Sequence, residues 1–189
     1  MAMGLPLNFR RANLLGDSVG PSPLPKLDGG IVALAGSCSA ATRRQVKRMS
    51  ARCPSVCIDP HDLASGKMSI EDVARWAAER VGQTPVLIYS TAEPEQVAAV
   101  QAQLGREAAG HLIEQAMGEL ALLLRQAGVR RFIVAGGETS GAVMAALSVR
   151  SLRIGPEIAP GVPWTVTEEE PRLCLALKSG NFGDEDFFE

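Results

Sequence analysis

The sequence predicts an α/β fold, a mostly parallel sheet with helices on both faces and an antiparallel C-terminal edge (three-layer αβα). Three observations carry this prediction. Short apolar runs alternate with segments of helical periodicity up to about residue 148, as in sheets whose parallel strands are joined by helices. The early runs are apolar without interruption, which is typical of strands covered on both faces. In the final third, strands follow one another with no helix between them, which indicates antiparallel pairing at one edge.

The individual elements follow from these patterns. The expected strands are 31–35, 55–59, 85–90 and 131–135, with shorter ones over 151–154, 164–167 and 173–178. The expected helices lie after residue 42, over 69–81 with Ser69 as the N-cap, over 107–128 with Gly128 as the C-cap, and after residue 136 to about residue 148. The longest helix has an apolar stripe at helical spacing, which predicts a core-facing side. Its members are Leu112, Ile113, Ala116, Met117, Leu120, Leu123 and Leu124.

Composition bounds the class of protein. The 189 residues are 46% apolar and 21% charged, as in one soluble globular domain. A net charge of −2 with no basic cluster argues against nucleic-acid and membrane-surface binding. No apolar run approaches the roughly 20 residues that span a bilayer. The N-terminus has no signal-peptide core, so we expect a cytoplasmic protein.

The stretch 16–30 is rich in Gly, Pro and Ser, which is typical of a linker. We therefore expect residues 1–29 to form an extended lead-in and residues 30–189 to form the folded domain. The four cysteines (Cys38, Cys53, Cys57 and Cys174) do not predict a metal site. Cys53, Cys57 and His61 lack a fourth ligand, so we interpret the cysteines as reduced, small side chains.

The first polar stretch that follows an apolar strand is GSCSAAT, residues 36–42. A helix N-terminus presents unpaired N–H groups and a partial positive charge. Ser37 and Ser39 can bond a phosphate there, or they can simply cap the helix. Both readings stay open on the sequence.

The second stretch is GGETSG, residues 136–141. It lacks the lysine of a P-loop and the spacing of the dinucleotide fingerprint. Adjacent glycines between a strand and a helix nevertheless let the backbone approach an anion. The alternative is a tight turn. Glu138 would repel a phosphate unless its carboxylate binds Mg²⁺, a sugar hydroxyl or an N–H group of its own helix.

The third stretch is KSGNFG, residues 178–183. Lys178 can supply a point charge to phosphate, and the glycines can supply N–H donors, although Asn and Gly are also ordinary turn residues. Between the second and third stretches, residues 154–165 hold three prolines and two glycines. We expect a stiff connection there, with Trp164 packed on the core.

Taken in order, these stretches resemble one family. GSCSAAT, VAGGETSGAV, IGPEIAPGVPWT and LALKSGNFG before EDFF resemble the C-terminal half of the four-carbon acid sugar kinases (3-oxo-tetronate, threonate and erythronate kinases). The resemblance spans residues 36–188, and LPLNFRR resembles the segment before that domain. Asp184 departs from the family pattern, which usually has another glycine. The departure implies a narrower last loop or a negative charge near phosphate.

The resemblance implies that this chain is the ATP-binding domain of such a kinase, with ATP and Mg²⁺ as cofactors. Its partner would be an N-terminal domain, on the same or a separate chain, that holds the acid sugar and supplies the catalytic base. No catalytic residue is assigned here, so we expect no catalysis by this chain alone; a homo-oligomer is a further expectation. The residues implied to surround the nucleotide are Ser37, Ser39, Gly136, Gly137, Glu138, Thr139, Ser140, Ser179, Gly180, Asn181, Phe182 and Gly183.

Two alternatives remain at this stage. The chain can be a non-catalytic α/β module that binds a sugar phosphate or a partner protein, or it can be a phosphosugar-binding domain of the isomerase type. The relative affinity for ATP and for a sugar phosphate separates the alternatives from the kinase hypothesis.

Overall fold

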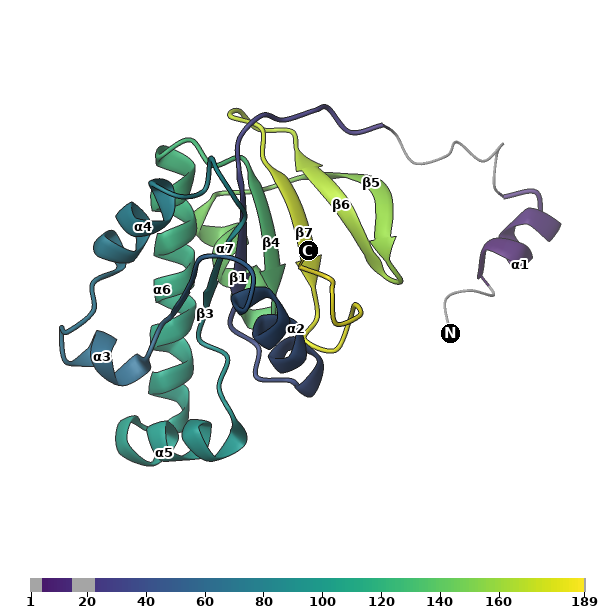
Figure 1. Cartoon of the computed structure of the whole chain (residues 1–189). Coiled ribbons are helices and arrows are strands. Elements are labelled where there is room, and N and C mark those ends of the chain that lie inside the picture. The colour runs from purple at the N-terminus through teal and green to yellow at the C-terminus, as the bar shows by residue number, and fades with distance from the viewer. Residues whose placement is uncertain (1–4, 15–22, 189) are drawn as a thin grey trace.

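A computed structural model describes residues 5–14 and 23–188, which contain a seven-stranded sheet in the order β2-β3-β1-β4-β7-β6-β5 (Figure 1). The first five strands in this order run parallel, and β6 and β5 are added antiparallel. The predicted fold class is confirmed. The strands are β1 (Ile31–Ala35), β2 (Ser55–Cys57), β3 (Val86–Tyr89), β4 (Arg131–Ala135), β5 (Leu152–Ala159), β6 (Val162–Thr167) and β7 (Cys174–Lys178).

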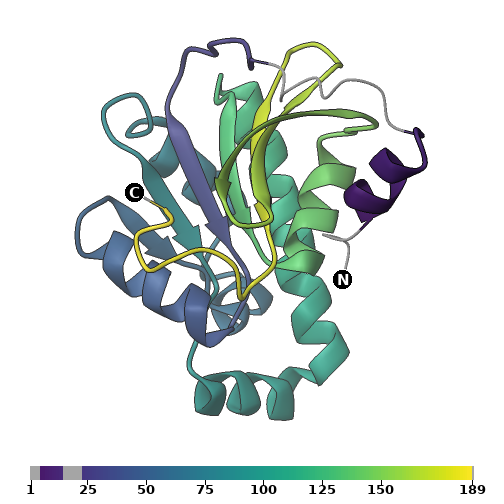
Figure 2. The same ribbon diagram turned by 90° about the vertical axis from the view of Figure 1, so that its right-hand side faces the viewer.

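Helices cover both faces of the sheet. α2 and the C-terminal segment lie on one face, and α4, α6 and α7 lie on the other, as Figures 1 and 2 show. α3 and α5 contact α6. The helices are α1 (Leu5–Arg11), α2 (Ala40–Ser50), α3 (Pro60–Ala64), α4 (Ile70–Ala78), α5 (Pro94–Leu104), α6 (Arg106–Gln126) and α7 (Gly137–Ala146). Of these, α1, α3 and α5 are not predicted from the sequence.

The sheet separates two apolar cores. The larger core joins α4, α6 and α7 to strand side chains such as Val32 and Phe132. The apolar stripe of α6 is confirmed: Met117, Leu120 and Leu124 are fully buried in this core. The smaller core lies under α2, where its buried residues meet Phe188 from the C-terminal segment. Burial on both faces explains why the parallel strands are continuously apolar.

Local signals set the helix ends. Ser69 is the N-cap of α4, as predicted, and its side chain accepts a hydrogen bond from the N–H of Asp72. Gly128 follows the C-cap of α6 with φ +96°, a conformation that glycine adopts at little cost and that ends the helix.

Two sequence expectations need correction. The lead-in is not wholly extended, because residues 5–11 form α1. Residues 154–165 are not a connecting loop, because β5 and β6 continue through them and form a hairpin. Register shifts in β5 accommodate Pro156, and an edge strand tolerates the missing donor of a proline. Trp164 packs against the smaller core, as predicted.

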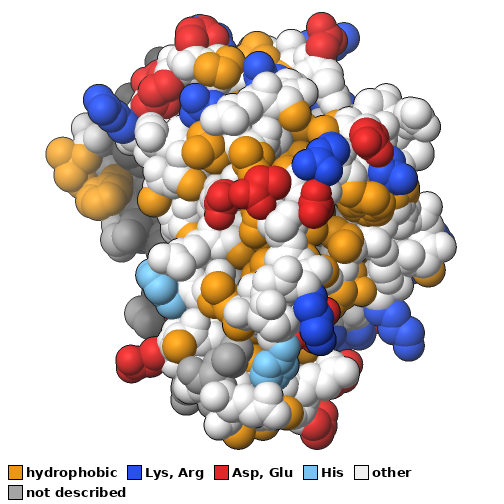
Figure 3. Space-filling model, turned by 90° about the vertical axis from the view of Figure 1, so that its left-hand side faces the viewer, with side chains coloured by type: hydrophobic (Ala, Val, Ile, Leu, Met, Phe, Trp, Pro, Cys, Tyr) orange, Lys and Arg blue, Asp and Glu red, His pale blue; other side chains and the backbone are white. Residues whose placement is uncertain are grey.

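The outer surface over α4 and α6 carries charges of both signs scattered among apolar side chains (Figure 3). This mixture differs from the single-sign field that electrostatic binding of nucleic acid requires. Within residues 5–14 and 23–188, none of the helices has the length and apolar character needed to cross a bilayer.

The strand order creates a point of divergence between β1 and β4. These strands are neighbours, but the chain leaves β1 through α2 toward β2 and leaves β4 through α7 toward β5. The two helices also lie on opposite faces of the sheet. In open α/β sheets such a divergence opens a crevice beyond the carboxyl ends of the strands, and ligands bind there.

The packing of α6 on α7 gives a test of the fold. A Cβ at Gly118 would lie 3.1 Å from the carbonyl oxygen of Ala142 and 3.2 Å from the Cβ of Ala146. We expect Gly118→Leu to lower the free energy of unfolding by roughly 1–3 kcal/mol in urea titrations, because overpacking forces the two helices apart. Gly110→Leu, in the same helix, is the matched control, because a Cβ at Gly110 would meet only Oε1 of Glu114, at 4.0 Å. Equal stability of the two variants would contradict the observed α6–α7 contact.

Candidate functional site

The three glycine-rich stretches meet at one edge of the sheet. β1, β4 and β7 are adjacent and parallel, and Ala35, Ala135 and Lys178 are aligned in register at their carboxyl ends. Backbone hydrogen bonds join the segments beyond these ends. The N–H of Gly36 donates to the carbonyl of Ala135 at 3.1 Å, and the N–H of Gly136 donates to that of Lys178 at 2.9 Å.

Glycine is required where these segments touch. A Cβ at Gly36 would lie 2.2 Å from Oγ1 of Thr139, and a Cβ at Gly180 would lie 2.1 Å from Oγ of Ser37. Gly136 has φ +128°, which side chains rarely tolerate. The glycines therefore let three separate turns pack into one surface.

Of the two roles left open on the sequence, the structure shows helix capping, and it adds a contact to the third stretch. Ser39 is the N-cap of α2, and its Oγ accepts from the N–H of Thr42 at 3.2 Å. The same hydroxyl donates to the carbonyl of Gly180. The Oγ of Ser37 in turn accepts from the N–H of Ser39 at 3.3 Å. Ser39 therefore caps the helix and ties the first stretch to the third, and Ser37 holds the backbone of Ser39.

The second stretch leaves a helix end open. Gly136 is the N-cap of α7, and within the described part of the chain no side chain caps this helix. Gly137 and Glu138, in its first turn, are exposed. Glu138 has no hydrogen-bond or ion-pair partner among residues 23–188, so its carboxylate contributes to the site only through position and charge. The unpaired N–H groups and the helix dipole favour an anion here.

Thr139 and Ser140 lie deeper in the same turn. Thr139 is buried between the first and second stretches, where it touches Gly36 and Gly136. The Oγ of Ser140 is buried with no hydrogen-bond partner among the described atoms. These two hydroxyls form the floor of the site.

Lys178 has a different position from the one its sequence suggests. It is only 2% exposed, and its ammonium donates to the carbonyls of Ser179 (3.3 Å), Gly180 (3.2 Å) and Phe182 (3.0 Å) and to Oγ1 of Thr42 (3.2 Å). Its Nζ also lies over the rings of two phenylalanines in the C-terminal segment. The ammonium thus faces the interior of the last loop, which corrects the expectation of a point charge offered to phosphate.

Two polar side chains of α2 were missed by sequence reasoning. Gln45, 1% exposed, donates through Nε2 to the carbonyls of Phe182 (3.1 Å), Gly183 (2.9 Å) and Asp184 (2.7 Å). Thr42 is fully buried and donates to the carbonyl of Gly180 at 2.8 Å. A signal existed, because these residues share the buried face of α2 with apolar side chains. Polar residues at core-facing positions of a helix indicate a buried partner.

A third missed residue is Thr91, which follows β3 and is 8% exposed. Its hydroxyl donates to the carbonyl of Ser37 at 2.9 Å and fixes the first stretch from the β3 side. The structure thus brings all twelve candidate residues into one region. The exposed members are Gly137, Glu138, Ser179, Asn181 and Phe182, the half-buried ones are Ser37, Ser39, Ser140, Gly180 and Gly183, and the buried ones are Gly136 and Thr139.

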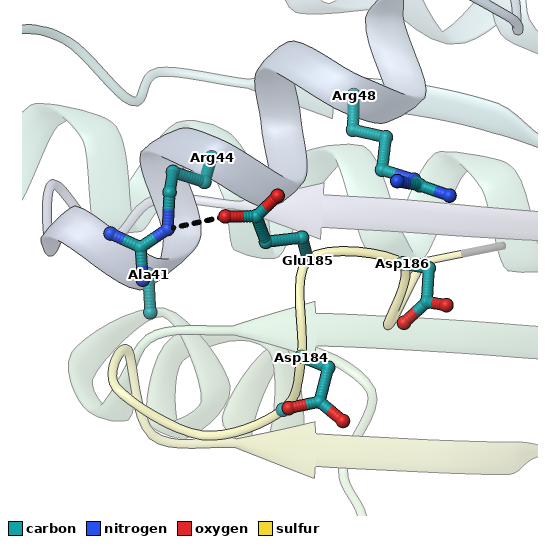
Figure 4. A pocket seen from close by; sticks show the side chains of 7 residues that line it. Ala41, Arg44, Arg48, Asp184, Glu185 and Asp186 are labelled. Carbon is teal, nitrogen blue, oxygen red and sulfur yellow. Dashed lines mark ion pairs between the residues drawn. The ribbon is translucent and has the colours of Figure 1, made fainter.

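A hollow of about 390 Å³ lies beside this region, between α2 and the C-terminal segment (Figure 4). It shares only Gly183 with the twelve candidates. Arg44 in its wall pairs with Glu185 at 3.0 Å, and two aspartates add further negative charge. Figure 4 shows the carboxylate of Asp184 turned away from α2. Its wall holds three carboxylates against the two guanidinium groups of Arg44 and Arg48, so this hollow suits an anion less well than the uncapped end of α7 does.

The fold and the site define an α/β protein with an uncapped helix end and glycine-rich turns at the carboxyl edge of its sheet. A family model described as "Nucleotide-binding C-terminal domain" matches residues 32–188. The chain belongs to this family.

Relatives agree with this assignment. The chain is 56% identical over 189 residues to a 3-oxo-tetronate kinase of Pseudomonas fluorescens and 54% identical over 190 residues to one of Cupriavidus necator. These matches cover all of this chain but only 43% and 44% of the relatives, so the chain spans less than half of their length.

Solved structures with a similar fold agree with this assignment. A Haemophilus influenzae protein superposes with a TM-score of 0.82 at 36% identity, over 98% of this chain and 44% of that one. A Salmonella typhimurium LT2 protein gives 0.81 at 41% identity, over 86% of this chain and 40% of that one. A more distant Bordetella bronchiseptica protein, a domain-swapped dimer, shares the fold at 22% identity, with a TM-score of 0.63 over 84% of this chain and 39% of that one.

The contact between Gly36 and Thr139 gives a double-mutant test of the convergence. We expect Gly36→Ala to lower the free energy of unfolding by roughly 1–3 kcal/mol, because its methyl group overlaps Oγ1 of Thr139. Thr139→Ala removes that oxygen, so the double variant is expected to recover part of the loss in urea titrations. Purely additive effects would show that the two stretches are not in contact.

Burial lowers the pKa of Lys178 from its ordinary 10.5 to about 8. The unfolded chain therefore binds more protons between pH 8 and 10.5, and the free energy of unfolding gains a contribution that rises with pH in this window. We expect urea titrations to give a steeper rise for the wild type than for Lys178→Met. Parallel pH profiles would contradict a buried lysine.

Proposed function

We propose that this chain is the ATP-binding domain of a kinase that phosphorylates a four-carbon acid sugar of the 3-oxo-tetronate, threonate or erythronate type. The similarity to 3-oxo-tetronate kinases supports the reaction class. The observation that carries the proposal is the uncapped N-terminus of α7 beside the last loop, at the point where β1 and β4 diverge. Triphosphate carries the charge that such a helix end attracts.

The proposal extends to the twelve candidate residues. In this proposal, the N–H groups of Gly137 and Glu138 bind phosphate oxygens, with Thr139 and Ser140 beneath them. The exposed ring of Phe182 and the side chain of Asn181 contact the remainder of the nucleotide. The two serines of the first stretch hold the opposite wall.

Mg²⁺ is a further part of the proposal. Protein sites for Mg²⁺ bound to phosphates use one or two carboxylates, with phosphate and water oxygens completing the shell. The exposed Glu138 carboxylate, unpaired among residues 23–188, fits this donor set. When bound, the ion would neutralise phosphate charge; the protein's own contribution is to place that carboxylate at the end of α7.

We infer that the acid-sugar site and the catalytic base belong to an N-terminal domain, as the partial coverage of the relatives suggests. The described site offers donors that position phosphates, and phosphoryl transfer depends mainly on positioning and charge neutralisation. The chain alone is therefore expected to bind ATP without turning it over. The division into a lead-in over 1–29 and a domain over 30–189 is part of this proposal, and so is homo-oligomerisation, which size measurements test.

A thermal-shift experiment tests the proposal. With Mg²⁺ and ATP at about 100 times Kd, binding adds about 2.7 kcal/mol of stability, which raises Tm by roughly 5–10 °C in a domain of this size. We expect Gly137→Val to fold normally, because its Cβ meets open space, and to lose the Tm shift, because the side chain covers the end of α7. Gly141→Val, one turn later and equally open, is the matched control that keeps the shift.

Two outcomes would contradict the proposal. No shift at millimolar ATP in the wild type would favour a non-catalytic module that binds a partner protein. A larger shift with a four-carbon sugar phosphate than with ATP would favour a phosphosugar-binding domain. The same plate, loaded with both ligands, distinguishes the three cases.

A further inference from the structure

The loop after β7 has most of its carbonyl groups turned toward the protein interior. The carbonyls of Ser179, Gly180 and Phe182 accept from the ammonium of Lys178, and those of Phe182, Gly183 and Asp184 accept from the amide of Gln45. The hydroxyls of Ser39 and Thr42, at the N-terminus of α2, also donate to the carbonyl of Gly180. Five carbonyls thus converge on two buried side chains.

The orientation of the carbonyls fixes the orientation of the N–H groups. Each peptide unit is planar, and the bonds of this loop are trans, so the N–H of the following residue points opposite to the carbonyl. The N–H groups of Gly180, Asn181 and Gly183 therefore point away from Lys178 and Gln45. None of the hydrogen bonds within residues 23–188 uses these three donors. Only the unit between residues 181 and 182 is reversed within the loop; its N–H closes a turn onto the carbonyl of Ser179 at 3.1 Å.

We infer that Lys178 and Gln45 are positioning residues: they hold the loop carbonyls inward and so direct the N–H groups of Gly180, Asn181 and Gly183 to the phosphates of the nucleotide. The inference rests on the proposed function, and it names the donors of the third stretch. Lys178 contributes no direct contact to phosphate. Its ammonium is enclosed by four oxygens and two aromatic rings, and the residue is 2% exposed.

The charge pattern explains why a cation and an amide occupy these positions. Carbonyl oxygens that converge without a donor are left unsatisfied, and each buried one destabilises the arrangement. A neutral apolar side chain at position 178 would therefore force the carbonyls to turn outward. The N–H groups would turn inward with them, and the loop would present oxygens to the phosphate.

Amide NMR on the 189-residue chain tests the inference in the wild type. Titration with ATP and Mg²⁺ is expected to move the amide signals of Gly180, Asn181 and Gly183, and adenosine, which lacks phosphate, is expected to move them less. Movement of other signals with these three unchanged would overturn the inference while the proposed function stands. If ATP moves no signal at all, the proposed function fails and the inference falls with it.

Lys178→Met and Gln45→Met then separate positioning from direct contact. In the nucleotide-free variants, we expect the amide of Phe182, which closes the turn, to exchange with solvent at least about tenfold faster, and ATP to bind roughly tenfold or more weakly. Lys47→Met and Gln115→Met, both at exposed helix positions, are the matched controls. If Lys178→Met binds ATP more weakly while the amide of Phe182 exchanges with solvent at the wild-type rate, Lys178 is a direct phosphate ligand and the inference is overturned. If Lys178→Met does not fold, Gln45→Met gives the same readouts.

Discussion

The candidate site depends on one constraint: β1, β4 and β7 end at the same level of the sheet. Because these strands are parallel neighbours in register, the segments that follow them emerge side by side, although they lie about 100 and 40 residues apart in the chain. Glycines at the contact points remove the side chains that would separate the segments. The divergence of the chain after β1 and β4 then keeps the helices from closing over the edge. A ligand surface follows from strand order before any particular side chain is considered.

The same surface is organised by polar groups that lie beneath it. Lys178, Gln45 and Thr42 are buried at a cost in desolvation, which for Lys178 appears as a pKa lowered to about 8. Their hydrogen bonds to five carbonyls of one loop offset that cost. Because a trans peptide unit directs its C=O and its N–H to opposite sides, carbonyls that bind buried donors below the loop leave N–H groups free above it.

The exposed residues at the edge of the site are consistent with a domain that binds its ligand together with a second domain. Gly137, Glu138, Asn181 and Phe182 are all exposed to solvent. The curated relatives are more than twice as long as this chain. An ATP site that opens toward a second domain would let that domain bring the acceptor and exclude water at closure, which is the arrangement the proposed kinase activity requires.

The sequence by itself determined the fold class, the four main parallel strands, the long helix and the three glycine-rich turns, because these depend on periodicity and on backbone freedom that particular residue types confer. It also named the residues that gather at the site. Only the tertiary structure decided which way Lys178 points. Because β7 lies inside the sheet and is covered on both faces, the alternation of residues along the strand does not show whether a side chain faces a ligand or the protein interior. It likewise turned the proline-rich stretch 154–165 into an edge hairpin, since only pairing with a neighbour reveals a bulged strand. The direction of Lys178 and the pairing of residues 154–165 both depend on position within the sheet, which is a property of the whole chain.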